Sequence, residues 1–121
     1  MSNNYKKSFD ERGILYAINS LNEFLVKRLY LIEPKQEVWR GKHYHKCCKQ
    51  FIILLNGKLT CKTIDINNNV KTFEMLPGST YYQDIGNAFC FKSVSEDTKI
   101  LVLCDKEFDK NDYYEVCLND E

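Results

Sequence analysis

Residues 51–66 have the sequence FIILLNGKLTCKTIDI, and this stretch decides the fold class of the chain. The apolar run at 51–55 is typical of a β-strand that is buried on both faces. It ends at the pair Asn56-Gly57, which tolerates the positive φ angles of a tight turn. Apolar Leu59 and Cys61 then alternate with polar residues over 58–66. The stretch predicts a buried strand and a half-exposed strand joined by a hairpin turn.

The same pattern of short β-branched and aromatic runs, separated by Gly, Asn, Asp and Pro, continues on both sides of this stretch. It predicts further strands at residues 13–18, 25–32, 38–46, 70–75, 79–83, 88–91 and 99–104. Residues 109–116 are the exception, because they predict one or two helical turns with Asp109 as the N-cap.

Many short strands with almost no helix predict an all-β fold, a cupin-like double-stranded β-helix (jelly roll). An immunoglobulin-like sandwich is the alternative, but the tryptophan-and-cysteine framework of that class is not visible around Trp39, the only tryptophan. With 121 residues, 44% of them hydrophobic, the chain is long enough for one core. We therefore expect a single cupin-like domain over residues 1–121.

Charge and cysteine usage narrow the class of partner and the compartment. Lys+Arg and Asp+Glu are equal at 17 each, so no strong field attracts nucleic acid or an anionic membrane. The six cysteines show no Cys-x-x-Cys spacing, and we expect most of them to be small buried hydrophobes. Residues 1–10 are polar and charged, and no apolar stretch approaches the roughly 20 residues that span a bilayer. These features predict a soluble, cytoplasmic protein.

Both histidines of the chain lie in the tripeptide His43-Tyr44-His45. Residues i and i+2 of a strand point to the same face, and imidazoles titrate near neutral pH, so the pair can move protons on one substrate. Arg40 and Lys46 lie close by and would suit an anionic, hydroxylated ligand. The alternative is that both histidines are hydrogen-bonded strand residues without a chemical role.

A metal site has little support in the sequence. Many cupins bind a metal through two histidines, a nearby carboxylate and a third histidine on a distant strand. Here no carboxylate follows His45 at that spacing, and the chain has no third histidine. A zinc site that uses Cys47 or Cys48 would need awkwardly adjacent ligands. We expect no metal and no other cofactor.

Several segments match one family in the right order. The most specific is Arg40-Gly41-Lys42-His43-Tyr44-His45-Lys46, followed closely by Gln50. Further matches are residues 9–13, 26–32, 50–53, 56–57 and 100–104, with Asp112-Tyr113 near the end. Over roughly residues 9–115, the chain resembles the nucleotide-sugar 3,4-ketoisomerases, WxcM-like cupins.

The resemblance implies a metal-independent isomerase that converts dTDP-4-keto-6-deoxyglucose into a 3-keto isomer. It also implies a homodimer that exchanges amino-terminal strands. Members of the family supply 3-amino-3,6-dideoxy sugars for bacterial surface polysaccharides, including lipopolysaccharide, and an aminotransferase and an acyltransferase normally act next.

The residues fit this chemistry, because moving a ketone from C4 to C3 needs two proton transfers. Family roles make His43 the candidate acid-base at carbon and His45 the candidate shuttle between the two oxygens, although the two roles could be exchanged. Tyr30 and Arg40 are candidates to stabilise the enediolate. The expected substrate-binding residues are Arg28, which shares a strand face with Tyr30, together with Arg40, Lys46, Gln50 and Arg12.

Two features leave the product and the activity open. Arginine at position 12 resembles the galacto-forming members, but a later strand that carries Trp followed by His or Arg in those members has Ala88 and Phe89 here. The departure removes a polar group expected to control the face on which C4 is reprotonated. The alternative function is a non-catalytic cupin that binds a sugar nucleotide or acts as a structural partner. A nucleotide-sugar 3,5-epimerase shares the fold class but fits the histidine cluster less well.

Overall fold

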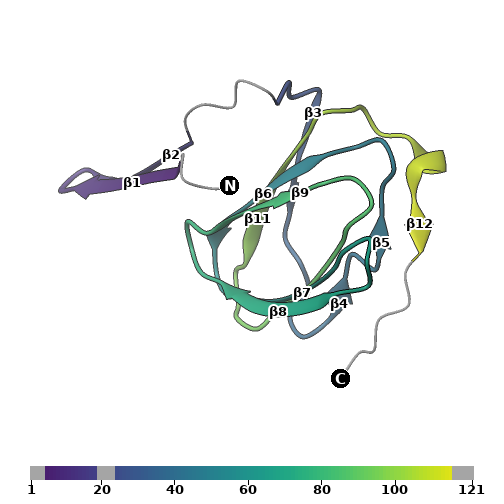
Figure 1. Cartoon of the computed structure of the whole chain (residues 1–121). Helices are drawn as coiled ribbons and strands as arrows, with labels where there is room; N and C mark the ends of the chain where they lie inside the picture. The colour runs from purple at the N-terminus through teal and green to yellow at the C-terminus, as the bar shows by residue number, and fades with distance from the viewer. Residues whose placement is uncertain (1–4, 19–23, 116–121) are drawn as a thin grey trace.

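The computed structural model describes residues 5–18 and 24–115 and consists almost entirely of β-strands (Figure 1). The strands are β1 (Tyr5–Asp10), β2 (Gly13–Ile18), β3 (Arg28–Ile32), β4 (Trp39–Arg40), β5 (His43–Tyr44), β6 (Gln50–Asn56), β7 (Leu59–Ile64), β8 (Val70–Met75), β9 (Thr80–Gln83), β10 (Ala88–Ser93), β11 (Lys99–Cys104) and β12 (Tyr114–Glu115). One 3-10 turn, η1 (Lys110–Asp112), precedes β12. The expected all-β fold is confirmed.

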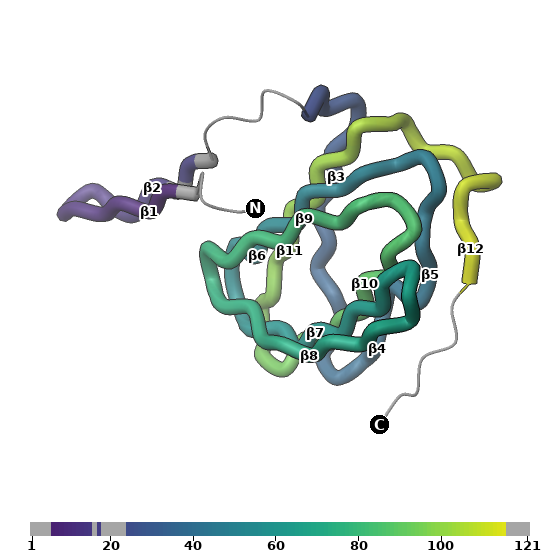
Figure 2. Tube along the Cα trace, viewed as in Figure 1, coloured from purple at the N-terminus to yellow at the C-terminus, as the bar shows by residue number. Residues whose placement is uncertain are grey.

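Two antiparallel sheets enclose the interior of a barrel, as the Cα trace shows (Figure 2). One sheet has the order β12-β5-β10-β7-β8, with β4 also paired to β10, and the other has the order β3-β11-β6-β9. Successive strands of the chain therefore alternate between sheets at several points, as in a jelly roll. The interior between the sheets holds the core and a cavity that borders it, because core residues such as Ile52, Phe89 and Val102 also line the cavity.

The alternation of side chains along each strand explains which face is buried. In β11, Ile100, Val102 and Cys104 point inward and are buried, while the residues between them are partly exposed. In β6, residues on both faces are buried, because Phe24 packs edge-on against Phe51 at 6.4 Å on the outer side. The predicted doubly buried strand is confirmed.

The predicted hairpin at Asn56-Gly57 is wrong. β6 pairs with β11 and β9, whereas β7 pairs with β10 and β8, so the turn carries the chain from one sheet to the other. Gly57 has a φ of 93°, and a Cβ there would collide with Thr98. The Asn-Gly signal identified the tight turn but could not say which strands pair across it.

The predicted strand at 38–46 is interrupted in the middle. Gly41, with a φ of 86°, separates β4 from β5 where the chain crosses the main chain of Phe89. His43 lies in β5 and His45 directly follows it. At the other end of the chain, the predicted helical turns reduce to η1, where the Asp109 side chain accepts a hydrogen bond from the main-chain N of Asn111 at 2.9 Å. Val116, the last residue of that prediction, lies outside the described residues.

The strand β1 was not expected, because its sequence is polar and charged. It pairs with β2 from Tyr5↔Ile18 to Asp10↔Gly13, and this hairpin extends away from the barrel (Figure 1). The expected connection at 19–23 lies outside the described residues.

Most described cysteines are buried as predicted: Cys48, Cys61, Cys90 and Cys104 are buried, and Cys47 is exposed. No helix among the described residues is long and apolar enough to cross a membrane.

Candidate active site

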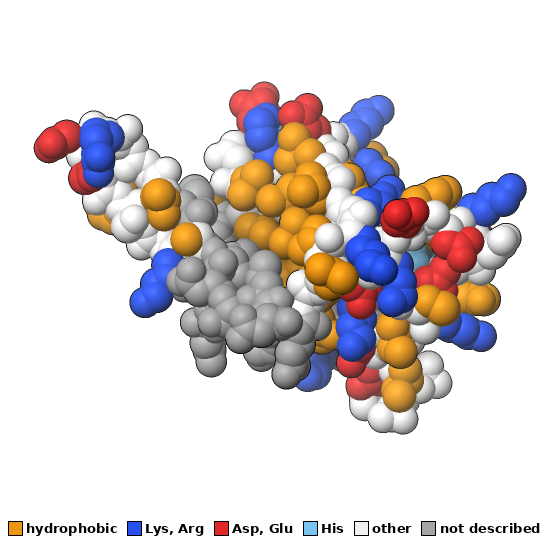
Figure 3. Space-filling view, turned by 90° about the horizontal axis from the view of Figure 1, so that it is seen from above, with side chains coloured by type: hydrophobic (Ala, Val, Ile, Leu, Met, Phe, Trp, Pro, Cys, Tyr) orange, Lys and Arg blue, Asp and Glu red, His pale blue; other side chains and the backbone are white. Residues whose placement is uncertain are grey.

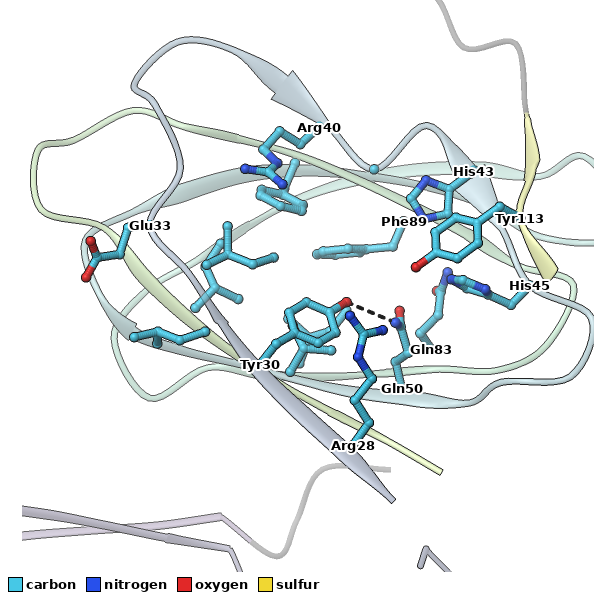
Figure 4. A pocket seen from close by; sticks show the side chains of 17 residues that line it. Arg28, Tyr30, Glu33, Arg40, His43, His45, Gln50, Gln83, Phe89 and Tyr113 are labelled. Atoms are coloured by element: carbon cyan, nitrogen blue, oxygen red, sulfur yellow. Dashed lines mark hydrogen bonds between the residues drawn. The ribbon is translucent and has the colours of Figure 1, made fainter. Parts of the chain in front are cut away.

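A cavity of about 460 Å³ opens between the two sheets and collects most of the predicted site residues (Figure 4). Its polar and aromatic lining comes from Arg28, Tyr30, Glu33, Arg40, His43, His45, Gln50, Gln83, Phe89 and Tyr113. Aliphatic side chains of Ile32, Ile52, Ile100 and Val102 complete the walls. The cavity therefore combines an apolar wall with a few convergent polar groups, as small-molecule sites do.

The two histidines lie side by side on one wall. Their ring centroids are 5.2 Å apart and their planes are nearly perpendicular. Tyr113 packs against both rings, 4.7 Å from His43 and 4.6 Å from His45. The i, i+2 spacing thus brings both imidazoles to the same cavity even though the strand ends between them.

The main chain fixes the orientation of His45. Its Nδ1 lies 2.8 Å from the carbonyl oxygen of Asp112, and a carbonyl can only accept, so Nδ1 carries the hydrogen in the neutral ring. The basic lone pair is then on Nε2, which is buried and has no hydrogen-bond partner among the described residues. The Asp112 carboxylate lies 3.6 Å from Nδ1.

Hydrogen bonds from the main chain directly after His45 hold the Asp112 side chain in place. Its carboxylate accepts hydrogen bonds from the main-chain N of Lys46 at 2.9 Å and of Cys47 at 3.2 Å. These bonds join the C-terminal segment to the residues directly after His45. The arrangement therefore fixes both the tautomer and the position of this imidazole.

His43 is less enclosed than His45, and its environment favours the neutral form. Burial and the neighbouring His45 lower the pKa of His43 below its usual value of 6.5. Both causes penalise the charged ring. His43 is therefore a neutral imidazole at pH 7, able to accept a proton.

Tyr30 faces the histidines from the opposite sheet and is prepared as a hydrogen-bond donor. Gln50 Nε2 donates to the Tyr30 hydroxyl oxygen at 3.1 Å, which leaves the phenolic hydrogen available to a ligand. Burial raises the pKa of Tyr30 to about 12, so the hydroxyl remains protonated at neutral pH. The same Gln50 amide also contacts Cys104 Sγ at 3.6 Å, and this second contact fixes its direction.

The two arginines line the cavity from opposite sides (Figure 4). Arg28 shares the inner face of β3 with Tyr30, as the strand parity predicts, and its guanidinium lies 4.5 Å from the Tyr30 ring centroid. Arg40, at the end of β4, also lines the cavity. The cavity therefore has a guanidinium group on each of two facing sides.

Two predicted binding residues lie outside the cavity of their own chain. Lys46 follows His45 and turns to the outside, where its Nζ lies 4.4 Å from the Tyr114 ring centroid. Arg12 lies in the turn between β1 and β2 and forms an ion pair with Asp10 at 2.7 Å. Neither side chain can reach a ligand in this cavity without help from another chain or a rearrangement.

Four residues that line the cavity or support its histidines were given no role from the sequence. They are Asp112, Tyr113, Gln83 and Phe89. The resemblance already ended on Asp112-Tyr113, which was a usable signal. Gln83 carried no signal, because only the pairing of Gln50 with Gln83 between β6 and β9 brings it to the site. Phe89 stacks on Tyr81 at 5.0 Å and gives the cavity an aromatic wall.

Within residues 5–18 and 24–115, no three His, Cys, Asp or Glu side chains are grouped to hold a metal ion.

Comparisons with known proteins agree on one family. The family profile described as WxcM-like, C-terminal (FdtA) matches residues 3–117. The TDP-4-oxo-6-deoxy-alpha-D-glucose-3,4-oxoisomerase of Aneurinibacillus thermoaerophilus is 34% identical over 115 residues, covering 91% of this chain and 81% of that protein.

Solved structures show the same cupin-like architecture. A variant of the 3,4-ketoisomerase from Thermoanaerobacterium thermosaccharolyticum, solved with TDP-4-keto-6-deoxyglucose, superposes with a TM-score of 0.80 at 27% identity, over 91% of this chain and 82% of that one. A 3,4-ketoisomerase from Helicobacter canadensis gives a TM-score of 0.78 at 27% identity, over 91% and 85% of the two chains. With two histidines on one wall of the cavity and these relatives, the chain belongs to the WxcM-like family of sugar 3,4-ketoisomerases and is an isomerase.

Proposed function

We propose that this protein converts TDP-4-keto-6-deoxyglucose into a TDP-3-keto-6-deoxyhexose, of galacto or gluco configuration at C4. The observation that carries the proposal is the pair of imidazoles on one cavity wall, with His45 Nε2 buried and unpaired among the described residues. The substrate is that of the relative at 34% identity. No metal and no other cofactor is needed in the scheme.

The reaction moves one proton between carbons and one between oxygens. His43 takes the C3 proton, the C3–H electrons form the C3=C4 double bond, and negative charge collects on the C4 oxygen. The Tyr30 hydroxyl and Arg40 stabilise this enediolate by hydrogen bonding. His45 carries the C3 hydroxyl proton to the C4 oxygen, the C3 carbonyl forms, and His43 returns its proton to C4. Atoms and electrons balance without an external oxidant or reductant.

Arg28 is the candidate to bind the diphosphate. It lines the cavity beside Tyr30, and guanidinium groups bind phosphate oxygens in pairs of hydrogen bonds. Gln50 supports the site by holding the Tyr30 hydroxyl. In this arrangement the sugar lies toward the histidines and the nucleotide extends past Arg28 to the outside.

A proton NMR time course in deuterated water tests the proposal. The purified protein is mixed with TDP-4-keto-6-deoxyglucose, and a 3-aminotransferase traps the unstable product. A 3-amino sugar with deuterium at C4 is the expected result, and the coupling constants at C4 distinguish galacto from gluco. Binding of the substrate without exchange or product would instead favour the non-catalytic sugar-nucleotide binder.

The acid limb of the pH profile is expected to lie below the ordinary imidazole value. His43 acts as a base only when neutral, so activity falls as the pH drops through its pKa, which burial and His45 hold below 6.5. The value of kcat/KM, followed directly by NMR between about pH 5 and 8, checks this. An inflection above 6.5 would contradict the assignment of His43 as the base.

Asp112→Asn is expected to lower kcat about 10- to 100-fold, because the negative charge 3.6 Å from His45 Nδ1 is lost while the ring carries a proton between the two oxygens. The main-chain carbonyl of residue 112 still fixes the tautomer, so TDP binding should be unchanged. Asp112→Ala removes the acceptor of two main-chain N–H groups and should also cost about 1–3 kcal/mol in unfolding free energy. Steady-state kinetics and urea denaturation separate the two effects, and an Asn variant with wild-type kcat would remove the carboxylate from the mechanism.

We further propose a homodimer in which the β1–β2 hairpin packs against the partner barrel. The hairpin exposes Phe9, and β3 is an edge strand whose outward Leu29 and Leu31 are 63% and 52% exposed. Hydrophobic side chains gather on the upper surface of the barrel, the side on which β3 runs in Figure 1 (Figure 3). Arg28 and Tyr30 of β3 line the cavity, so a hairpin beside this strand would bring its Arg12 to the partner's site.

Light scattering at micromolar concentration checks the assembly. A dimer mass is expected for the full chain and a monomer mass for Phe9→Asp, because a charge cannot be buried unpaired in an apolar interface. A monomer mass for the wild-type chain would contradict the dimer and leave Arg12 without a route to the substrate.

The 3-keto product places the protein before an aminotransferase that forms a 3-amino-3,6-dideoxy sugar, with an acyltransferase following. Such sugars supply surface polysaccharides such as lipopolysaccharide. Because the substrate is a nucleotide-linked sugar, we place the reaction in the cytoplasm, in one domain formed by residues 1–121.

A further inference from the structure

The inner end of the cavity contains a second buried acceptor that the mechanism above does not use. Gln83, the last residue of β9, is 2% exposed, lines the cavity and lies opposite Gln50 in the pairing of β9 with β6. In the close view of the site it lies beside Gln50 (Figure 4). The loop that follows it reaches the main chain of His45, where Gly86 N donates to the His45 oxygen at 2.7 Å. Its Oε1 is buried and has no hydrogen-bond partner among the described residues.

The orientation of the Gln83 amide is fixed by a main-chain carbonyl. Gln83 Nε2 donates to the oxygen of Asn87 at 2.5 Å. Turning the amide over would place Oε1 against that carbonyl, and two acceptors facing each other repel. Gln83 is therefore held as an unpaired acceptor in the wall of the cavity, and leaving a buried acceptor unpaired costs about 1–3 kcal/mol.

His45 and Gln83 differ in the kind of hydrogen bond that they can form, and this difference indicates which oxygen of the sugar each one contacts. His45 Nε2 accepts a hydrogen bond when the ring is neutral and donates one when the ring is protonated, whereas Gln83 Oε1 can only accept. In the proposed reaction the C3 oxygen changes from hydroxyl to carbonyl and the C4 oxygen changes in the opposite direction. Only the C2 hydroxyl, next to C3, is a donor in substrate, enediol and product.

We propose that Gln83 accepts a hydrogen bond from the C2 hydroxyl of the sugar, and that the site thereby selects 2-hydroxy over 2-deoxy substrates. This inference rests on the proposed 3,4-ketoisomerase function. The contact also sets the ring so that the C3 oxygen lies at His45 and the C4 oxygen points to the donor groups of Tyr30 and Arg40. A sugar without the C2 hydroxyl leaves Gln83 Oε1 buried and unpaired.

Turnover of TDP-4-keto-6-deoxyglucose and of its 2-deoxy analogue tests the proposal. The wild-type protein is expected to prefer the 2-hydroxy substrate by about 10- to 100-fold in kcat/KM, because a buried polar group left unpaired penalises the analogue. Gln83→Met, similar in size but without the acceptor, should lower kcat/KM for the 2-hydroxy substrate by about that factor and leave the analogue unaffected. Most of the change should fall on KM, since the C2 hydroxyl does not react.

A matched control separates recognition from stability. Thr98 is also buried, away from the cavity, and its hydroxyl contacts Ser93 Oγ at 2.5 Å. Thr98→Val loses a buried hydrogen bond and should keep the wild-type preference.

The outcomes are distinct. Equal turnover of both sugars by the wild-type protein overturns the proposal even if Gln83→Met does not fold. So does a Gln83→Met variant that loses the same factor on both sugars. If the 2-hydroxy substrate binds but is not isomerised at all, the proposed function itself fails.

Discussion

His43→Asn is expected to abolish exchange of the sugar C3 proton with solvent, with a fall in rate of about 10³- to 10⁴-fold, toward the upper end of what general acid-base groups contribute. His43 is the base in the proposed scheme, and burial and His45 lower its pKa so that it is neutral at pH 7. Asparagine cannot take the proton. Proton NMR of the substrate in deuterated water measures the exchange directly.

His45→Asn should behave differently, and the difference assigns the two roles. With His43 intact, deuterium should still enter C3 of the recovered substrate, while formation of the 3-keto product falls by a similar factor. The reason is that His45 moves a proton between oxygens and takes no part at carbon. If His43→Asn keeps the C3 exchange and His45→Asn loses it, the two assignments are reversed.

Tyr44→Phe is the matched control for both variants. Tyr44 lies between the two histidines but turns to the other face, where it stacks on Tyr114 at 5.3 Å. Exchange and turnover should remain close to the wild-type values. TDP binding and thermal melting of all three variants show that the fold is kept, and wild-type exchange in both histidine variants would remove the pair from catalysis.

Gly41→Ala is expected to destabilise the protein and to remove activity together. Gly41 has a φ of 86°, a conformation that costs a residue with a Cβ about 1–2 kcal/mol. A Cβ would also collide with the carbonyl oxygen of Phe89, adding an overpacking cost of about 1–3 kcal/mol. The chain cannot retreat, because β4 and β5 both pair with β10 on either side of Gly41.

The effect on activity follows from the position of His43. Its main-chain N donates to the Gly41 carbonyl at 2.7 Å, so a displaced Gly41 moves the imidazole away from the ligand space. Urea denaturation and the isomerisation assay measure the two losses. A Gly41→Ala protein with wild-type stability and turnover would show that this crossing does not position the site.

Gly86→Ala is the control for the backbone angle alone. Gly86 has a φ of 84°, but a Cβ there meets only the end of the exposed Ile66 side chain, which can move aside. We expect the unfolding free energy of this variant to fall by only about 1–2 kcal/mol, which is the cost of the backbone angle. A loss as large as that of Gly41→Ala would mean that the contact with Phe89 adds nothing.

The strand pattern predicted the fold class because its causes are local. Alternation in β7 and β11, the doubly apolar run of β6 and the parity of Arg28 and Tyr30 on β3 all follow from a period of two along an extended chain. Turn residues were also recognised correctly as turns. The error at Asn56-Gly57 arose because a turn does not specify which strands pair, and pairing depends on partners far away in the sequence.

The sequence by itself determined the all-β class, the placement of both histidines on one face, and the family, through a motif concentrated in residues 40–50. Only the tertiary structure decided how this motif is completed. Asp112 comes to His45 from the C-terminal segment, and Gln83 comes to the same cavity because β9 pairs with β6. The physical reason is range: side-chain parity is set by neighbouring peptide units, whereas burial, proton position and unpaired acceptors depend on which distant strands the packed core brings together.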